Sequence, residues 1–566
     1  MKENFADNVE LTITGSGAEM EGVARLDGMA VFVPGALPGE RVRAHITKRA
    51  AKFARAELDE VLEASPDRCT PECPHAGQCG GCTLMHMNYQ ATLKSKAQHI
   101  RDCITRIGGA DDVLRAMHGM EKTYAYRNRV QFPVGGKAGA PKVGFYKCNT
   151  HDVIDLPDGC MLLKPELNHA RAIFAAWLRD SNLAPYDERT HRGIVRHAVF
   201  RVSRTGALMA IIVVNGSKLP GYEGLFRALE RVGCVSLVLN ELTDAPGSRR
   251  NTEIFGKKFV TLCGKEHYMD AILGCQFELS APSFFQINPE MTDKLYSLGV
   301  KAAMLKDGET LLDAYCGAGT IGLTMLKHAN ASHSRLIGIE AVPEAIENAR
   351  RNAKLNGIEN AKFICGRCEQ ELSKLVAKGI CPDAAVIDPP RKGCDEALLS
   401  ALNELGKRSL KRIVYISCNP ATLARDVKIL RELGWRLEWA DGVDMFPWTA
   451  HAETVVLLSH KKADSYIHID VEFGEGEGKI PVDSIAKRAE AYKPKEKVTY
   501  KMIKEYIEAK YGFKVHTAYI AEVKRNLGLP MYDAPNAVEE LKQPKKHPTP
   551  EKVEAIKDAL RYFAVI

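Results

Sequence analysis

Three short motifs in the second half of the chain place a thiol and two carboxylates next to apolar segments. Asp388–Arg391 and Ser417–Pro420 each follow an apolar run, and their prolines end the preceding strands. Cys418 stands just before a predicted helix, whose N-terminal dipole can acidify the thiol for nucleophilic attack. Glu453 precedes the last apolar segment, which places a carboxylate near the same edge. The alternatives are a cysteine that fills core space and a glutamate that is merely solvated.

A glycine-containing turn and a later acid form a candidate nucleotide site. Leu311–Thr320 is an apolar strand that runs into Gly317 and Gly319 before a predicted helix. These glycines let backbone approach a ligand, and Glu340, 21 positions after Gly319, can accept hydrogen bonds from ribose hydroxyls. The turn lacks the third glycine of dinucleotide sites, which favours S-adenosylmethionine over a nicotinamide dinucleotide. Without the acid, the same glycines would indicate only a tight turn.

Residues 65–90 hold a dense group of cysteines and glycines. Cys73, Cys79 and Cys82 are close in sequence, and the glycine turns between them let several sulfurs point at one centre. Sites with four cysteines hold either zinc or an iron–sulfur cluster, and spacing alone does not decide between them. Cys69 is a further candidate ligand, but the spacings differ from those of the radical CxxxCxxC motif.

The elements that must position these residues change character along the chain. Residues 1–64 alternate apolar and polar residues between turns and predict a small β domain, and residues 65–282 predict a mostly β region after the cysteine loop. Residues 283–460 alternate strand-like and helix-like segments, which predicts a doubly wound parallel sheet of the α/β class. Residues 461–497 have the composition of a linker, and residues 498–566 predict a small helical domain of unknown role with a helix-turn-helix pattern.

Composition excludes fibrous, wholly disordered and membrane-spanning classes. The chain has 566 residues, 45% hydrophobic and 26% charged, with a net charge of +7 that permits a nucleic-acid partner. The longest apolar run, Ala207–Val214, is far shorter than the ~20 residues of a membrane span. Sixteen cysteines without an export signal indicate a reducing cytoplasm. Two stretches without acids, Arg41–Arg55 and Arg189–Arg204, favour a polyanion, although solvated or structural arginines would give the same pattern.

Taken together, the motifs resemble one family. The chain is similar to the RNA uracil-5-methyltransferases, of the type that modifies 23S ribosomal RNA, over roughly residues 1–460. The resemblance rests on the order and spacing of Phe284–Asn288, Asp313–Thr320, Asp388–Arg391, Ser417–Pro420 and His451–Glu453. It implies an N-terminal TRAM domain, which is an OB-like β-barrel that binds RNA. It also implies a mostly β central domain and a Rossmann-like methyltransferase domain that uses S-adenosylmethionine.

The resemblance also implies roles for individual residues. Cys418 is then the nucleophile and Glu453 the base. The positions that contact S-adenosylmethionine are Gln286, Tyr315, Thr320, Glu340 and Asp388. The ligands of a [4Fe–4S] cluster are Cys73, Cys79, Cys82 and Cys160, which leaves Cys69 over. Arg367 departs from the amide or acid that the family often carries near the adenine, so the adenine contact stays unassigned.

The expected function is methylation of carbon 5 of a uridine in RNA by a monomer, with 23S ribosomal RNA as the first candidate substrate. Transfer RNA is the second, since the catalytic motifs are shared between the two branches. A cytosine-5-methyltransferase uses similar thiol addition, but its motifs differ and a carboxylate base suits uracil. A non-catalytic RNA-binding or ribosome-assembly factor on a methyltransferase scaffold is the remaining alternative, and the intact Cys418, Glu453 and Glu340 argue against it.

Overall fold

The computed structural model describes residues 8–243, 253–329, 333–460, 500–527 and 548–562. Contacts divide the chain into two compact units, residues 1–466 and residues 467–566, which are described separately below. The predicted linker, residues 461–497, lies outside the described residues. None of the helices in the described ranges combines the length and apolar character needed to span a bilayer.

A six-stranded sheet forms the N-terminal domain, in the order β1-β5-β6-β4-β3-β2. Its strands are β1 (Asn8–Thr12), β2 (Gly15–Ser16), β3 (Gly22–Leu26), β4 (Met29–Val33), β5 (Arg41–Arg49) and β6 (Phe53–Glu63). Alternate residues of β5 are buried, so its apolar side chains fill the core and its basic ones face outward. On that outer face Arg41 pairs with Glu10 and Glu63 at 3.0 and 2.8 Å.

The segment that follows β6 carries the cysteine loop and then a helix. α1 (Tyr89–Asp102) begins at Asn88, whose side chain caps it by accepting from the Ala91 N–H at 2.8 Å. A short π-helical turn, η1 (Cys103–Ile107), and β7 (Leu114–His118) continue the chain. One side chain of α1, Lys96, is wholly buried and is part of the active-site support described below.

The central domain is a seven-stranded sheet in the order β10-β9-β8-β11-β12-β13-β14. Its strands are β8 (Arg129–Lys137), β9 (Ala140–Tyr146), β10 (Val153–Asp155), β11 (Val195–Val202), β12 (Leu208–Val214), β13 (Cys234–Glu241) and β14 (Lys258–Gly264). α2 (Pro165–Asp180) and α3 (Tyr222–Glu230) pack on the sheet through Leu167, Phe174 and Leu225. A hairpin of β15 (His267–Ile272) and β16 (Cys275–Ser280) follows.

Two of the five arginines in the stretch Arg189–Arg204 are structural, which was one of the interpretations that the sequence left open. Arg196 and Arg201 lie on β11, where both are buried. Arg201 donates to the Ser283 carbonyl at 2.7 Å, because a buried cation needs acceptors in place of water. The other three arginines are exposed, and one of them, Arg204, donates to the Ala271 carbonyl at 2.7 Å.

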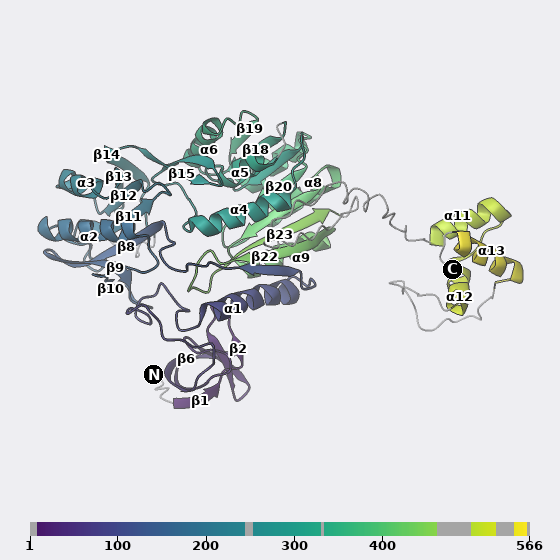
Figure 1. The fold of residues 1–566 in the computed structure, drawn as a ribbon, viewed down its shortest axis with the longest axis horizontal. Coiled ribbons are helices and arrows are strands. Elements are labelled where there is room, and N and C mark those ends of the chain that lie inside the picture. The colour runs from purple at the N-terminus through teal and green to yellow at the C-terminus, as the bar shows by residue number, and fades with distance from the viewer. Residues whose placement is uncertain (1–7, 244–252, 330–332, 461–499, 528–547, 563–566) are drawn as a thin grey trace, which may run out of the picture. The chain divides into compact units, whose positions relative to one another are not determined.

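An eight-stranded sheet of order β19-β18-β17-β20-β21-β23-β22-β7 forms the α/β domain (Figure 1). Its new strands are β17 (Thr310–Ala314), β18 (Arg335–Glu340), β19 (Ala361–Cys365), β20 (Ala384–Ile387), β21 (Arg412–Ser417), β22 (Trp435–Val443) and β23 (Glu453–His460). The helices are α4 (Pro289–Ala303), α5 (Thr320–His328), α6 (Pro343–Leu355), α7 (Cys368–Ala377), α8 (Glu396–Arg408) and α9 (Pro420–Glu432). The first five strands are parallel, as the alternation of strands and helices predicted. β7 completes the far edge although it lies far upstream in the sequence.

The C-terminal unit contains α11 (Tyr500–Tyr511), α12 (Thr517–Asn526) and α13 (Pro550–Tyr562). They share an apolar core of their own, which includes Ile507, Ile520 and Ile556.

Candidate active site

The candidate catalytic residues meet at one edge of the eight-stranded sheet. β20 and β21 are parallel neighbours that end at this edge, just before Asp388 and Cys418 respectively. β23 runs antiparallel to β21, so it begins where β21 ends, with Ser417 opposite Thr454. Glu453, the first residue of β23, is therefore held at the same edge as the thiol.

A pocket of about 860 Å³ opens at this edge, which is within the usual size range of small-molecule sites. The predicted catalytic and cofactor-binding residues that line it are Gln286, Tyr315, Glu340, Asp388, Cys418 and Glu453. Thr320 is not among the lining residues. Its hydroxyl lies 2.9 Å from the hydroxyl of the buried Tyr296. The topology thus brings together all but one of the positions that the motifs indicated.

The glycine turn after β17 leaves space for a ligand. Gly317 has a φ of 53°, and a Cβ added to it would meet no heavy atom within 4 Å. Its N–H donates to Glu340 Oε2 at 3.2 Å, and the Val342 N–H donates to Oε1 of the same side chain at 3.0 Å. The two bonds fix the carboxylate at the end of β18, beside an open glycine backbone. This arrangement fits the ribose of a nucleoside such as S-adenosylmethionine.

Burial sets the protonation of the ionisable groups in the pocket. It raises the pKa of Asp388 to about 7, and it raises that of Glu453 to about 8 with a further contribution from the charge of Asp388. The pKa of the Cys418 thiol rises to about 11, first through burial and then through the charges of Glu453 and Asp388. The acidified thiol expected from the helix dipole is therefore absent, because burial and two carboxylates outweigh the dipole. Arg391 opposes the shift at both Cys418 and Glu453.

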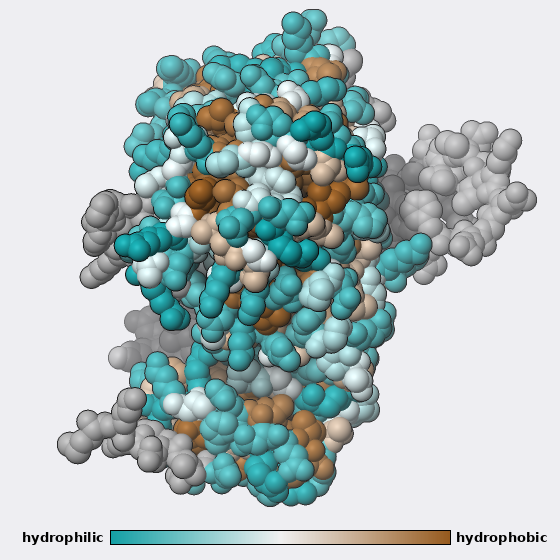
Figure 2. Space-filling view, turned by 90° about the vertical axis from the view of Figure 1, so that its left-hand side faces the viewer, coloured by the Kyte–Doolittle hydropathy of each residue, from teal (hydrophilic) through white to brown (hydrophobic). Residues whose placement is uncertain are grey.

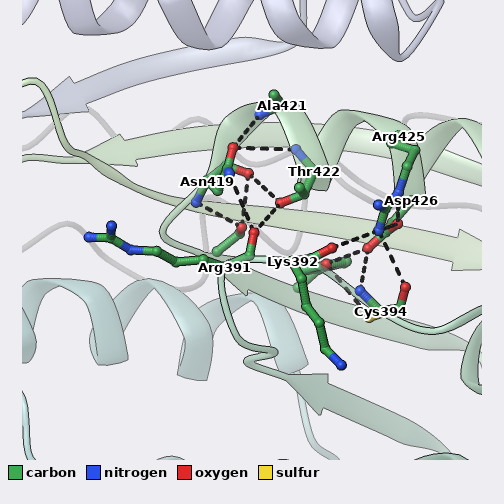
Figure 3. A network of polar contacts seen from close by, with 10 residues as sticks. Arg391, Lys392, Cys394, Asn419, Ala421, Thr422, Arg425 and Asp426 are labelled. Carbon is green, nitrogen blue, oxygen red and sulfur yellow. Dashed lines mark hydrogen bonds and ion pairs between the residues drawn. The ribbon is translucent and has the colours of Figure 1, made fainter. Parts of the chain in front are cut away.

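A polar network ties the loop after β20 to the helix after β21 (Figure 3). The Asn419 amide and the Thr422 hydroxyl both donate to the Arg391 carbonyl, at 3.3 and 3.2 Å. Deeper in the network, the buried carboxylate of Asp426 accepts from the Cys394 N–H at 2.7 Å. The backbone that presents Arg391 is thus fixed to α9, while its guanidinium extends away from the network.

The sequence did not predict the buried polar contacts that hold the loop between β22 and β23 in place. Phe446, in this loop, lines the pocket. Its carbonyl accepts from Lys96 Nζ at 3.1 Å, and the same ammonium donates to Asp444 Oδ1 at 2.6 Å, with both side chains fully buried. Tyr89 donates its hydroxyl to the other oxygen of Asp444 at 2.8 Å. No local motif marks these residues, because the partners are far apart in the chain.

Arg367, for which the sequence left the adenine contact unassigned, also lines the pocket. Cys368 and Glu369 line it as well, and Arg367 pairs with Glu369 at 2.9 Å. Phe284, a further lining residue, is 66% exposed, which is unusual for a large apolar side chain and offers a face for stacking.

The predicted cluster ligands line a second, small cavity of about 30 Å³ with mostly apolar walls. These ligands are Cys73, Cys79, Cys82 and Cys160. The thiols are close enough to raise one another's pKa: that of Cys82 rises to about 12 through burial and then through Cys160, Cys79 and Cys73. Cys69 is not among the lining residues, and its thiol donates to the Met85 carbonyl at 3.5 Å.

The four cysteines of this cavity are the candidate ligands for zinc or for an iron–sulfur cluster, the two groups that the spacing left open. Within the ranges that the structure describes, no group of three or more His, Cys, Asp or Glu side chains is arranged to hold a metal ion. A single zinc ion requires its sulfurs to converge at ~2.3 Å. In a [4Fe–4S] cluster each cysteine binds a different iron, so the four sulfurs surround a larger body. Four cysteines line the cavity, which supplies the number of ligands that either arrangement needs.

Comparison with known proteins adds independent findings. Residues 272–461 match the family described as tRNA (Uracil-5-)-methyltransferase, and residues 7–58 match the TRAM domain. An uncharacterized RNA methyltransferase of Clostridium acetobutylicum is 40% identical over 458 residues, which is 80% of this chain and 97% of the relative. One from Halalkalibacterium halodurans is 40% identical over 460 residues, or 81% of this chain and 98% of the relative.

Among solved structures, the chain is similar to the Pyrococcus abyssi tRNA (uracil-54, C5)-methyltransferase in complex with S-adenosyl-L-homocysteine. The TM-score is 0.63 and the identity 26%, over 79% of this chain and 99% of the other. The C-terminal unit, by contrast, lies beyond both family matches. The matches confirm the expected fold class, with its N-terminal TRAM domain and its methyltransferase domain.

Proposed function

The chain belongs to the RNA uracil-5-methyltransferase family and uses S-adenosylmethionine, and from this premise we propose that it methylates carbon 5 of a specific uridine in 23S ribosomal RNA. The observation that carries the proposal is the position of Cys418 and Glu453 on one wall of a nucleoside-sized pocket. We propose Cys418 as the nucleophile and Glu453 as the base. We propose that Gln286, Tyr315, Glu340 and Asp388, which line the same pocket, hold the methyl donor, with Thr320 in support at the start of α5.

Carbon 5 of uracil is a poor nucleophile, so the enzyme must first activate the ring by adding a nucleophile of its own to it. When the Cys418 thiolate adds to carbon 6, a C–S bond forms and the ring becomes an enolate with carbanion character at carbon 5. Bound S-adenosylmethionine supplies a methyl group on a positively charged sulfur, which carbon 5 accepts. The high pKa of the Cys418 thiol means that its proton must leave before addition. Of the two neighbouring carboxylates, Asp388 is the one that can receive this proton while Glu453 stays ionised for the later step.

The methylated adduct still carries a proton at carbon 5. Glu453 removes that proton as a carboxylate, and the C–S bond then breaks to return the Cys418 thiolate and the 5-methyluracil ring. Burial suits Glu453 to this role, since its pKa of about 8 makes it a stronger base than an exposed glutamate. The target base must leave its stack to reach the pocket, which favours an unpaired region of the RNA.

We further propose that Cys73, Cys79, Cys82 and Cys160 hold a [4Fe–4S] cluster. The apolar cavity that they line supports this proposal. Methyl transfer needs no redox step, so the group would hold the cysteine loop in shape. The thiols must be deprotonated to bind iron, and the Arg127 charge partly opposes the rise that burial causes in the pKa of Cys82 and Cys160.

The choice of 23S ribosomal RNA rests on the TRAM domain together with the cysteine loop, and we propose that the protein acts on it as a monomer in the cytoplasm. Transfer RNA is the second candidate, because the structurally similar Pyrococcus abyssi enzyme is a tRNA (uracil-54, C5)-methyltransferase. Incubation of the protein with unmodified transcripts of each RNA, followed by mapping of 5-methyluridine, distinguishes them. Methylation of the tRNA transcript alone would overturn the ribosomal assignment.

Trapping of the covalent adduct tests the mechanism. Glu453→Gln should allow addition and methyl transfer but block elimination, so a protein–RNA complex stable to denaturant should accumulate. Cys418→Ala should abolish both that complex and turnover, a loss on the order of 10⁴-fold. The matched control is Cys365→Ala, which removes an exposed cysteine of the same domain and should leave turnover unchanged. Turnover retained by Cys418→Ala would overturn the mechanism.

A further inference from the structure

A second large cavity, of about 940 Å³, lies in the central domain and shares no lining residue with the active-site pocket. Its walls are the ends of β8, the β9–β10 hairpin and the segment from Pro185 to His197. It occurs on the side of the molecule where β8, β9 and β10 lie (Figure 1). Figure 2 views this side and shows hydrophilic and hydrophobic residues intermixed over it.

Planar side chains dominate the chemistry of this cavity. The rings of Tyr146 and His151 lie 5.0 Å apart, and the Arg196 guanidinium stacks 4.0 Å from the Tyr186 ring centroid. The Tyr186 hydroxyl is hydrogen-bonded to His191 at 2.9 Å. Rings of this kind stack on nucleobases of any sequence, as in proteins that bind single-stranded nucleic acid.

The formal charges on the cavity wall cancel. The cations are Lys142, Arg189 and Arg196, and the acids are Asp152, Asp187 and Glu188. A site for a phosphate backbone would instead carry an excess of cations. The balance favours a neutral, planar, polar group, which in RNA is the nucleobase.

A histidine of β11 brings a buried ring nitrogen to the cavity. His197 lines the cavity from β11, and its Nδ1 is buried without a hydrogen-bond partner in the described structure. Burial and the charge of Arg196 lower the pKa of His197 to about 4, so the imidazole is neutral at physiological pH. A neutral imidazole can donate to or accept from the edge of a base.

We infer that this cavity binds an unpaired nucleoside of the RNA substrate, at a position other than the methylated uridine. The inference rests on the proposed function for the identity of the RNA. Stacking on Tyr146 and His151 provides affinity, while the polar edge of the base meets His197. The cavity therefore contributes to the choice of RNA rather than to the chemistry of methyl transfer.

The cysteine loop is connected to this cavity through the β9–β10 hairpin. The Gly80 N–H donates to the Tyr146 carbonyl at 3.3 Å, and the Cys148 N–H donates to the Gln78 carbonyl at 2.8 Å. The loop that carries three of the proposed cluster ligands thus braces the wall that carries the stacking ring.

The test compares dissociation constants for two RNAs. The first is an unmodified full-length 23S ribosomal RNA transcript, and the second is a short hairpin that contains only the target uridine and its loop. His151→Ala and Tyr146→Ala, each made in a Cys418→Ala background so that nothing is turned over, should weaken binding of the full-length transcript about ten-fold. Binding of the short hairpin should not change. His169→Ala, which alters an exposed histidine of α2 outside the cavity, is the matched control.

Salt dependence and cross-linking complete the test. The variants should keep the wild-type slope of log K against log salt, because no phosphate contact is lost. Transcripts that carry 4-thiouridine should cross-link to peptides spanning residues 142–153 or 185–197. Unchanged affinity for the full-length transcript, equal losses on both RNAs, or a slope reduced by about one unit would each overturn the inference. Failure of the wild type to methylate any uridine would instead count against the proposed function, since these binding measurements do not require turnover.

Discussion

The active-site pocket and the cysteine cavity both gather side chains from distant parts of the chain, and burial raises pKa values in both, with different results for carboxyl groups and for thiols. In the pocket, burial leaves Asp388 and Glu453 with pKa values of about 7 and 8, so these carboxyls can exchange protons near neutral pH. In the cavity, burial raises the pKa of Cys82 to about 12, so its thiol keeps its proton until a metal displaces it. The same physical effect thus brings two carboxyl groups into the range of proton transfer near neutral pH, whereas it keeps the Cys82 thiol protonated, which metal binding would have to overcome.

The largest effect should come from removing a ligand of the cysteine cavity. Anaerobically purified wild-type protein should contain about four irons per chain, and Cys79→Ser should lose most of them. Cys69→Ser is the matched control and should retain them, since Cys69 is not among the residues that line the cavity. Iron content and the visible absorption spectrum provide the measurement.

The same variant sharpens the comparison between the two regions. Cys79→Ser should still methylate a short hairpin substrate, because the active-site pocket shares no lining residue with the cysteine cavity. Stoichiometric zinc without iron in the wild type would contradict the cluster assignment.

The second effect tests how the chain supports its active site. Lys96→Met leaves the Asp444 carboxylate buried without its cation and should lower the free energy of unfolding by about 3 kcal/mol. Because the Phe446 loop then loses its anchor, kcat should fall more than substrate affinity. Lys94→Met, which alters an exposed lysine of the same helix, should change neither quantity. Chemical denaturation and steady-state kinetics measure the two effects, and a wild-type unfolding midpoint in Lys96→Met would refute this account.

A third effect follows from the raised pKa of Glu453. Elimination needs the carboxylate, and the raised pKa keeps Glu453 mostly protonated at pH 6 and mostly ionised by pH 9. Decay of the covalent adduct should therefore speed up about ten-fold per pH unit below pH 8 and level off above it. Rapid-quench measurement of the adduct gives the profile. A rate independent of pH from 6 to 9 would exclude Glu453 as the base.

The smallest effect concerns the N-terminal sheet. Arg49 and Lys52 are exposed, whereas Arg41 is paired with Glu10 and Glu63. Changing both Arg49 and Lys52 to Gln should reduce the slope of log K for RNA binding against log salt by about two. Arg41→Gln, the comparison variant, should change it less. Equal slopes in all three proteins would mean that this face does not contact phosphate.

Much of the α/β domain could be predicted from its sequence, because parallel strands bring their carboxyl ends to one edge. The sequence therefore predicts that Asp388, Cys418 and Glu453 meet at the ends of β20 and β21 and the start of β23, and the structure has them there. The stretch Arg189–Arg204 shows the limit of this reasoning. A run of arginines gives charge but not burial, and β11 lies between two other strands where its side chains are enclosed.

The buried ion pair that holds the active-site loop could not be predicted from the sequence, for a different reason. The pair of Lys96 and Asp444 joins a helix after the cysteine loop to a loop near the end of the sheet. The periodicity of apolar residues predicts where a helix or strand forms. It does not predict which side chains from distant parts of the chain will contact that helix or strand. The shift of the Cys418 pKa is of the same kind, since it depends on two carboxylates that arrive from other strands.

The edge strand β7 has a consequence for how the protein is made. β7 ends at His118, but its partner β22 begins only at Trp435, roughly 320 residues later, so at ~5–20 residues per second β7 waits roughly 15–60 s for its partner during synthesis. For that time one edge of the future sheet exists without the strand it must join. If synthesis ends before Trp435, β7 has no strand to pair with, and a chain with such an unpaired edge is a natural target for chaperones and proteases.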